Sequence, residues 1–242
     1  MSPNSPAPVY SPTSLSVGGR SLFLGPLFGP LAGLTFLGTA VIAQLGIWLI
    51  VAYTWAAALS APLSIFTYHP LLQTVSCAAF VQAILVLQPT HAPDQKRAGQ
   101  RVHASLVLVG IVLATAGTAV IEYNKISGGR EHFRAVHNYL GVTTGVVIVV
   151  QVLFGFTMWA VPALYGGEAR AKAVWKYHRW SGYTILVLLL ATIISATKTD
   201  ANDVMLGMSV WMLSAFAVLV LLGTFPRIKL QKMGLAPRRD GQ

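Results

Sequence analysis

The sequence is poor in charge and in cysteine, and each shortage excludes a class of protein. Charged residues make up 10% of the 242 residues, and only seven are Asp or Glu. A soluble domain carries about 25% charged residues, so this chain has too little polar surface for a soluble enzyme. The single cysteine, Cys77, excludes an intramolecular disulfide, an iron–sulfur cluster and any cofactor attached through a CxxCH motif.

Long apolar stretches fill the chain instead. It is 55% hydrophobic, with a mean hydropathy of +0.64. A helix needs about 20 apolar residues to cross the hydrocarbon of a bilayer, and six segments meet that length: 31–57, 63–87, 102–121, 135–161, 174–196 and 204–225. Their short connections favour antiparallel neighbours. We therefore predict an all-α, six-helix transmembrane bundle, a multi-pass protein whose partner is the lipid bilayer.

Basic residues are unevenly spread over the two sides of this predicted bundle. Of the 17 Lys and Arg residues, 13 fall on the side that would hold both termini and the connections after the second and fourth helices, and 4 fall on the other. Basic residues gather on the cytoplasmic side of membrane proteins, so both termini are expected in the cytoplasm. The net charge of +10 is then explained by basic residues in the cytoplasmic loops and tails, and we expect no nucleic-acid partner.

Composition divides the chain into three regions. Residues 1–25, rich in Ser and Pro, are expected to form a disordered cytoplasmic tail. Residues 26–228 are expected to form the transmembrane domain, and residues 229–242 a cytoplasmic C-terminal tail.

Four histidines stand near the starts of the second to fifth apolar segments. They are His69, His103, His137 and His178, at intervals of 34, 34 and 41 residues. A lone histidine in a membrane helix more commonly bonds to a neighbouring helix, but ionisable residues there are costly and often functional. Because successive helices run in opposite directions, His69 and His137 fall at one depth, near the non-cytoplasmic face. His103 and His178 fall together near the cytoplasmic face, so the pattern predicts two sites.

Each predicted site offers two imidazoles and little else. Structural zinc needs four protein ligands and catalytic zinc three, whereas an iron porphyrin supplies four nitrogens itself and needs only two axial ligands. Gly141 and Gly182 each follow a ligand candidate by four residues, on the same helix face. A missing side chain there leaves room for a flat ring. Gly141 with Gly145 also forms a GxxxG motif, so helix packing is the alternative.

Three segments resemble the cytochrome b561 family of six-helix transmembrane electron carriers. They are RVHASLVLVG around His103, HFRAVHNYLGVTTG around His137 and WKYHRWSGY around His178. The resemblance extends from about His69 to Ala196 and is closest to the short, stand-alone form. It implies two non-covalent haem b groups in a four-helix core formed by the second to fifth helices. The axial ligand pairs would be His69–His137 and His103–His178. It also implies one-electron transfer from cytoplasmic ascorbate to monodehydroascorbate or a ferric chelate.

Basic residues near the predicted sites are candidates for binding the substrates. An ascorbate anion needs cations close to the inner haem, and six cluster in sequence around the cytoplasmic pair: Lys96, Arg97, Arg101, Lys172, Lys176 and Arg179. On the outer side, His132 and Arg134 precede His137, and His132 could relay a proton. Plain positive-inside charge is the alternative for the six cations, and a solvated loop is the alternative for His132.

Two other functions remain open at this stage. The chain could be a haem-bearing electron-transfer subunit that serves a quinol or a protein partner. It could also be a membrane protein whose histidines only pack helices together or bind without redox chemistry. The sequence also leaves open whether the protein forms a homodimer.

Overall fold

The computed structural model describes residues 38–235. The tail predicted for residues 1–25 lies outside the described residues, as do residues 236–242. The predicted class is confirmed, because the described residues form no strand and contain six helices apolar enough to span a membrane. These helices are α2 (Ala40–Ser60), α3 (Ile65–Leu87), α4 (Pro93–Ser127), α5 (Val136–Ala160), α6 (Glu168–Ser195) and α7 (Val210–Thr224).

Two helices extend further than the apolar pattern predicts. Helix α4 begins at Pro93 and not near residue 102, because proline suits the first turn of a helix and polar residues continue it beyond the apolar stretch. Helix α6 begins at Glu168 and not near residue 174. Both extensions are polar. They therefore add helix outside the hydrocarbon and leave the number of spans unchanged.

The last helix begins later than predicted, at Val210 and not near residue 204. Residues Asn202–Leu206 form a short π-helix that ends at Gly207, whose φ is +59°. The Asn202 side chain accepts a hydrogen bond from the Met208 backbone N–H at 2.9 Å and donates to the Thr197 carbonyl at 3.2 Å. These bonds hold the chain in a tight turn, so the apolar residues of this turn do not join α7.

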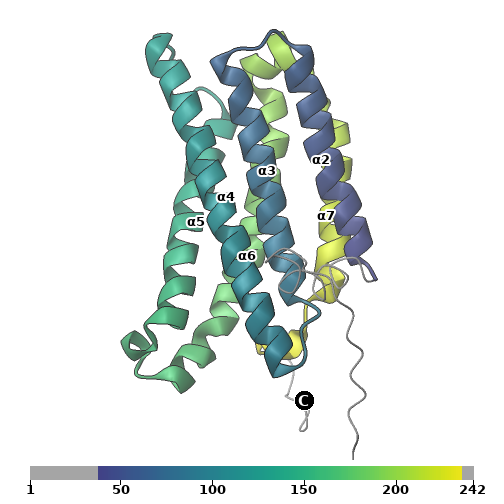
Figure 1. The fold of residues 1–242 in the computed structure, drawn as a ribbon. Coiled ribbons are helices and arrows are strands. Elements are labelled where there is room, and N and C mark those ends of the chain that lie inside the picture. Colours follow the sequence, from purple (N-terminus) through teal and green to yellow (C-terminus); the bar gives the residue numbers. More distant parts are fainter. Residues whose placement is uncertain (1–37, 236–242) are drawn as a thin grey trace, which may run out of the picture.

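Helices α2 and α7 pack closely through two glycines. A Cβ placed on Gly46 would lie 2.7 Å from the carbonyl oxygen of Phe216, and one placed on Gly223 would collide with the backbone of Ala43. Small residues of this kind let membrane helices approach. The main buried cluster joins these two helices with α3 and α6. Helices α2 and α7 therefore form a tightly packed flank beside the rest of the bundle (Figure 1).

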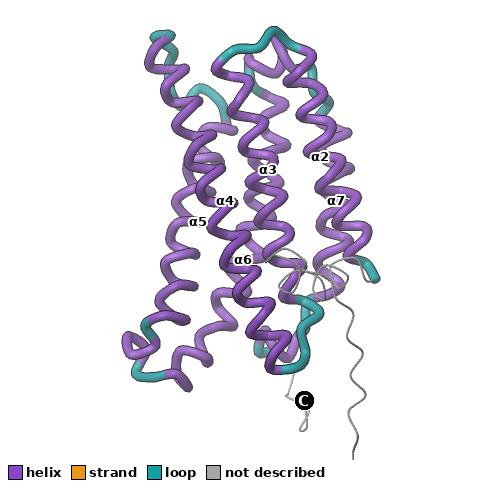
Figure 2. The backbone as a smooth tube through the Cα atoms, in the orientation of Figure 1, coloured by secondary structure: helices purple, strands orange, loops and turns teal. Residues whose placement is uncertain are grey.

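The other four helices form two antiparallel hairpins, α3–α4 and α5–α6. Packing is extensive within each hairpin, whereas α4 touches α5 and α3 touches α6 at few points. The tube in Figure 2 shows the two hairpins running the full length of the bundle. The four histidines of the sequence pattern lie on these helices, one on each.

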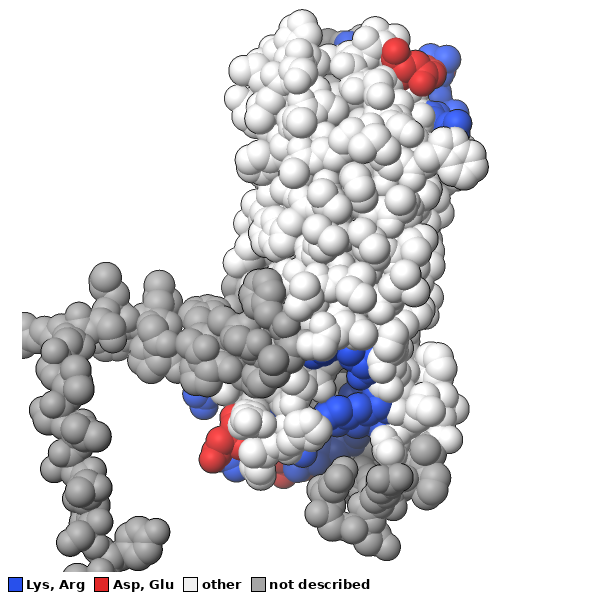
Figure 3. Space-filling model, turned by 90° about the vertical axis from the view of Figure 1, so that its right-hand side faces the viewer, with Lys and Arg blue, Asp and Glu red and all other residues white. Residues whose placement is uncertain are grey.

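The charges gather at the two ends of the bundle. We call the end that carries the α3–α4 connection, the α5–α6 connection and residues 225–235 the basic end. The other three connections form the opposite end. Figure 3 shows Lys and Arg gathered around a hollow at the basic end and few charges at the opposite end. The face in that view carries no charged side chains between the two ends, as expected of a surface that faces lipid.

Candidate functional site

One histidine pair lies toward the opposite end of the bundle. His69 on α3 and His137 on α5 have ring centres 6.3 Å apart, with ring planes at 83°. His69 Nδ1 lies 2.9 Å from the Gly117 carbonyl oxygen, and His137 Nδ1 lies 2.9 Å from that of Thr192. A carbonyl only accepts, so both Nδ1 atoms carry the proton. Each Nε2 then keeps its lone pair for another partner.

The second pair lies toward the basic end. His103 on α4 and His178 on α6 have ring centres 6.4 Å apart, with ring planes at 78°. His103 Nδ1 donates to the Ala83 carbonyl at 2.8 Å. His178 differs from the other three, because its buried Nδ1 has no hydrogen-bond partner among the described residues. These are the two pairs expected from helix direction, and their role as metal ligands stays a prediction.

The two pairs occupy separate layers of the bundle. On α3, His69 stands 14 residues before Ala83, whose carbonyl binds the other pair, and on α4 the same interval separates His103 from Gly117. Fourteen residues are nearly four turns, so both layers lie on one face of each helix, about 21 Å apart. The layers are thus far enough apart to hold two separate groups.

Both ring separations suit two imidazoles that share one metal atom. A metal–imidazole bond is about 2.0 Å long and the ring centre lies about 1.1 Å beyond the nitrogen, so two such rings have centres about 6 Å apart. The separations of 6.3 and 6.4 Å match that value. No group of three or more His, Cys, Asp or Glu able to hold a metal occurs within residues 38–235. A metal here therefore needs further ligands from a cofactor, and a porphyrin supplies them.

Of the two glycines predicted to clear space for a ring, Gly141 is free of tight helix contacts and Gly182 is not. A Cβ on Gly141 would meet only the Thr192 side chain, at 3.9 Å, and one on Gly145 would meet nothing within 4 Å. This pair therefore does not act as a close-packing GxxxG motif. A Cβ on Gly182 would lie 3.3 Å from the Gln151 amide nitrogen. Room beside the histidines is thus present on α5.

Sequence reasoning missed one glycine that touches a histidine directly. A Cβ on Gly155 of α5 would lie 2.8 Å from Cε1 of His178 on α6. Four residues earlier, the Gln151 amide donates to the His178 carbonyl at 2.7 Å. No local pattern could identify Gly155, because its partner lies on the next helix.

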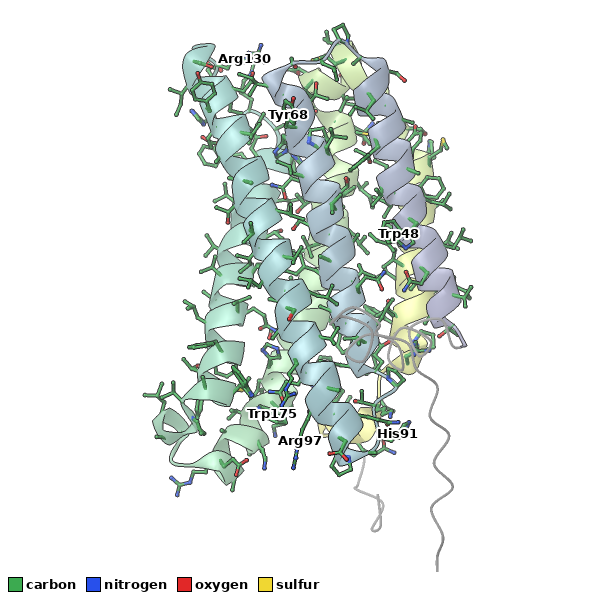
Figure 4. The ribbon with its side chains drawn as sticks, in the orientation of Figure 1. Trp48, Tyr68, His91, Arg97, Arg130 and Trp175 are labelled. Atoms are coloured by element: carbon green, nitrogen blue, oxygen red, sulfur yellow. The ribbon has the colours of Figure 1, made fainter. Side chains whose placement is uncertain are left out.

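The six cations predicted near the basic-end pair have different partners. Lys172 pairs with Glu168 at 3.0 Å, and the Lys176 ammonium lies 5.0 Å from the centre of the Tyr177 ring. Arg179 donates to the Lys232 carbonyl at 2.9 Å. The other three, on the first turns of α4, are Lys96, Arg97 and Arg101, and all are exposed. Figure 4 labels Arg97 at this end of the bundle.

The C-terminal segment adds cations that the sequence analysis did not select. Burial, followed by the charges of Lys229, Arg179 and Lys96, lowers the pKa of Lys232 to about 8. The Lys229 charge in turn lowers the pKa of His91, whose ring nitrogens lie 3.2 and 3.3 Å from the Lys229 ammonium. The sequence analysis did not select Lys229 and Lys232, because it assigned residues 229–242 to a C-terminal tail.

At the opposite end, the predicted outer residues form ion pairs. His132 Nδ1 lies 3.1 Å from a carboxylate oxygen of Glu122, and Arg134 lies 3.6 Å from Glu131 and 3.9 Å from Asp200. Arg130 and Tyr68 are labelled at this end in Figure 4. His132 precedes His137 by five residues and lies on the loop just before α5. His132 therefore belongs to the surface above the His69–His137 pair.

Comparison with known proteins matches the same part of the chain. The family model for eukaryotic cytochrome b561 covers residues 68–202, which include all four histidines. Human and mouse transmembrane ascorbate-dependent reductase CYB561 are each 26% identical, over 164 and 167 residues. Those alignments cover 67% of this chain and 63% of the relatives, so the chain spans less than two thirds of their length. Human lysosomal membrane ascorbate-dependent ferrireductase CYB561A3 is 24% identical over 132 residues, or 54% of each chain.

Proposed function

Because this chain belongs to the cytochrome b561 family, we propose that it is a transmembrane one-electron oxidoreductase. The proposed donor is cytoplasmic ascorbate, and the proposed acceptor on the other side is monodehydroascorbate or a ferric chelate. Relatives named ascorbate-dependent reductase and ferrireductase support this donor, and the second name supports the ferric acceptor.

The observation that carries the proposal is the pair of ring separations in two layers. The family implies haem b, and His69–His137 and His103–His178 are the residues that would hold one haem each. Their ring centres are 6.3 and 6.4 Å apart, the spacing of two imidazoles on one metal atom. When bound, each haem supplies an iron that alternates between the ferric and ferrous states and so carries one electron at a time.

The chain's own residues hold and orient the ligand rings. The carbonyls of Gly117, Ala83 and Thr192 each accept the Nδ1 proton of a histidine. These bonds leave the Nε2 lone pairs available and would make the imidazoles better ligands. Gly141 leaves room beside His137 on α5, whereas Gly182 packs against the Gln151 amide. The helices that carry both layers are apolar over lengths that can span a membrane.

The charge distribution supports an orientation for the molecule. We propose that the basic end is cytoplasmic, so that residues 26–228 form the membrane domain with both termini in the cytoplasm. Six cations would then draw the donor anion to the His103–His178 layer: Lys96, Arg97, Arg101, Lys172, Lys176 and Arg179. The donor ascorbate loses one electron and one proton there and becomes monodehydroascorbate, and the proton passes to water. His132 and Arg134 would face the acceptor at the opposite end.

Haem content and spectra test the proposal. Purified protein, expressed with adequate haem supply, should bind about two haems per chain and show a b-type α band when ascorbate is added. His103→Ala should remove the haem of one layer and retain the haem of the other. The exposed His91 provides the control, since His91→Ala should keep both.

Three outcomes would contradict the proposal. They are the absence of haem, equal loss of both haems in His103→Ala, and a haem-loaded protein that ascorbate does not reduce. Stopped-flow reoxidation in vesicles loaded with monodehydroascorbate or with a ferric chelate then identifies the acceptor.

A further inference from the structure

The chain after α7 turns back across the basic end. We call residues 228–235 the C-terminal strap. Its 3-10 helix, Leu230–Met233, is held by two side chains of α6: Arg179 donates to the Lys232 carbonyl at 2.9 Å, and Trp180 Nε1 donates to that of Met233 at 3.3 Å. The Met233 side chain is only 4% exposed. Because Arg179 and Trp180 directly follow His178, the strap is anchored beside the basic-end histidine pair.

The strap places Lys229 and Lys232 close to cations on α4 and α6. The Lys229 ammonium lies against the His91 ring, and that of Lys232 donates to the Thr90 carbonyl at 3.5 Å. The charge of Lys96, in the first turn of α4, acts on both. Four residues from three segments thus form the cation cluster: Lys96, Arg179, Lys229 and Lys232. Lys96 precedes His103 by seven residues, so the cluster begins about 10 Å from the histidine layer along α4.

The cation cluster is not balanced by acidic side chains. No Asp or Glu within residues 38–235 forms an ion pair with any of its four members. Like charges close together in partly buried positions raise the energy of the charged state. Burial is the main reason that the pKa of Lys232 is lowered to about 8, and the repulsion from Lys229, Arg179 and Lys96 lowers it further. An anion placed among the four side chains would relieve it.

We propose that the C-terminal strap completes the docking site for the donor, a small anionic reductant, at the basic end. This inference rests on the proposed function and adds Lys229 and Lys232 to the residues that recognise the donor. Lysine suits a small polar anion, because its ammonium is a compact point charge on a flexible stem. The strap places that charge beside the layer to which the donor gives its electron.

A double variant tests the charges of the strap. Holoprotein carrying Lys229→Gln and Lys232→Gln should show a KM for ascorbate raised roughly tenfold, with kcat nearly unchanged and a weaker dependence on ionic strength. Its haem content, α band and midpoint potentials should equal those of the wild type. Lys198→Gln removes one positive charge at the opposite end and should leave the KM unchanged. Reduction by a neutral hydroquinone should be the same in all of these proteins.

A second variant tests the position of the strap without changing any charge. Trp180→Phe removes the hydrogen bond to Met233 and should raise the KM for ascorbate by a smaller factor. An unchanged KM and salt dependence in both variants would overturn the docking role. So would haem loss or a shifted midpoint potential with an unchanged KM, because the lysines would then serve the carboxylates of the haem. If the hydroquinone reduces the wild type and ascorbate does not, the proposed function itself fails.

Discussion

At the scale of single residues, the neighbours of the four histidines differ, although the side chains are the same. Three of them are oriented by a backbone carbonyl, whereas His178 is held by the close approach of Gly155. A metal ligand tolerates little displacement, because ligand orientation depends on the groups behind it. If His178 is a haem ligand as proposed, Gly155 acts as a positioning residue for it.

Replacing this glycine should affect one layer only. In Gly155→Ala, the new methyl group would lie 2.8 Å from Cε1 of His178, so the imidazole must move. We expect haem content to fall from about two toward one per chain, with the His69–His137 layer retained. Val149→Ile enlarges an exposed side chain on the same helix and should change nothing. Full haem content in Gly155→Ala, with unaltered spectra, would rule out the positioning role.

At the scale of helices, the bundle has two kinds of contact: close packing between α2 and α7, and sparse contact between the two hairpins. Helices α2 and α7 meet through Gly46 and Gly223 and are packed backbone to backbone. The two hairpins touch each other sparsely, and the histidine pairs bridge them. The flank therefore contributes stability through close packing, whereas the two hairpins contact each other at few points.

The flank should be sensitive to one added methyl group. In Gly223→Ala, the new carbon would overlap the backbone of Ala43. Overpacking of this kind costs about 1–3 kcal/mol, so the melting temperature in detergent should fall clearly. Gly145→Ala, whose added carbon meets nothing within 4 Å, serves as the control in the haem-free protein. Equal melting temperatures for the two variants would contradict the close contact.

The strap predicts a pH dependence for donor binding. A lysine whose pKa is lowered to about 8 is charged below that pH and neutral above it. The groups that face Lys232 are Lys229, Arg179, Lys96 and the Thr90 carbonyl. As pH rises through about 8, Lys232 should lose its charge, and the KM for an anionic donor should increase. Lys232→Arg, which stays charged, should remove that step, and a pH-independent KM in the wild type would argue against it.

At the scale of the whole molecule, the charges distinguish the two ends. The basic end carries the strap and the first turns of α4, and the opposite end carries Arg130 and the His132–Glu122 pair (Figure 4). Anionic lipid and the membrane potential favour basic loops in the cytoplasm. The family match over residues 68–202 covers the four helices with the histidines, whereas α2 and α7 lie outside it.

Single-cysteine labelling should reveal the orientation. The one native cysteine, Cys77, is buried, so a cysteine introduced at the surface is the main target of a membrane-impermeant maleimide. In sealed right-side-out vesicles, Arg130→Cys should label at once and Arg97→Cys only after permeabilisation. These two exposed positions lie at opposite ends of the bundle. The reverse labelling pattern would place the basic end outside the cytoplasm.

The sequence by itself determined the class of the fold and its most important side chains. Long apolar segments have one stable solution in lipid, a helix, because every backbone group must be paired within the segment. Alternating helix direction then sorts His69, His103, His137 and His178 into two depths. Their rings meet in those pairs, at 6.3 and 6.4 Å. The helices and the histidine pairs follow from the length of the apolar segments and the alternating direction of the helices, and both can be read from the sequence.

Only the tertiary structure decided which residues contact the histidines and where residues 228–235 pack. Gly155 and the carbonyls of Gly117 and Ala83 act across helix interfaces, and their sequence neighbours give no sign of it. The strap reads as a tail because it is short and follows the last apolar segment, yet hydrogen bonds from Arg179 and Trp180 hold it against α6. Such contacts depend on the relative rotation and depth of packed helices. Packing of the whole bundle sets both, and no single segment encodes them.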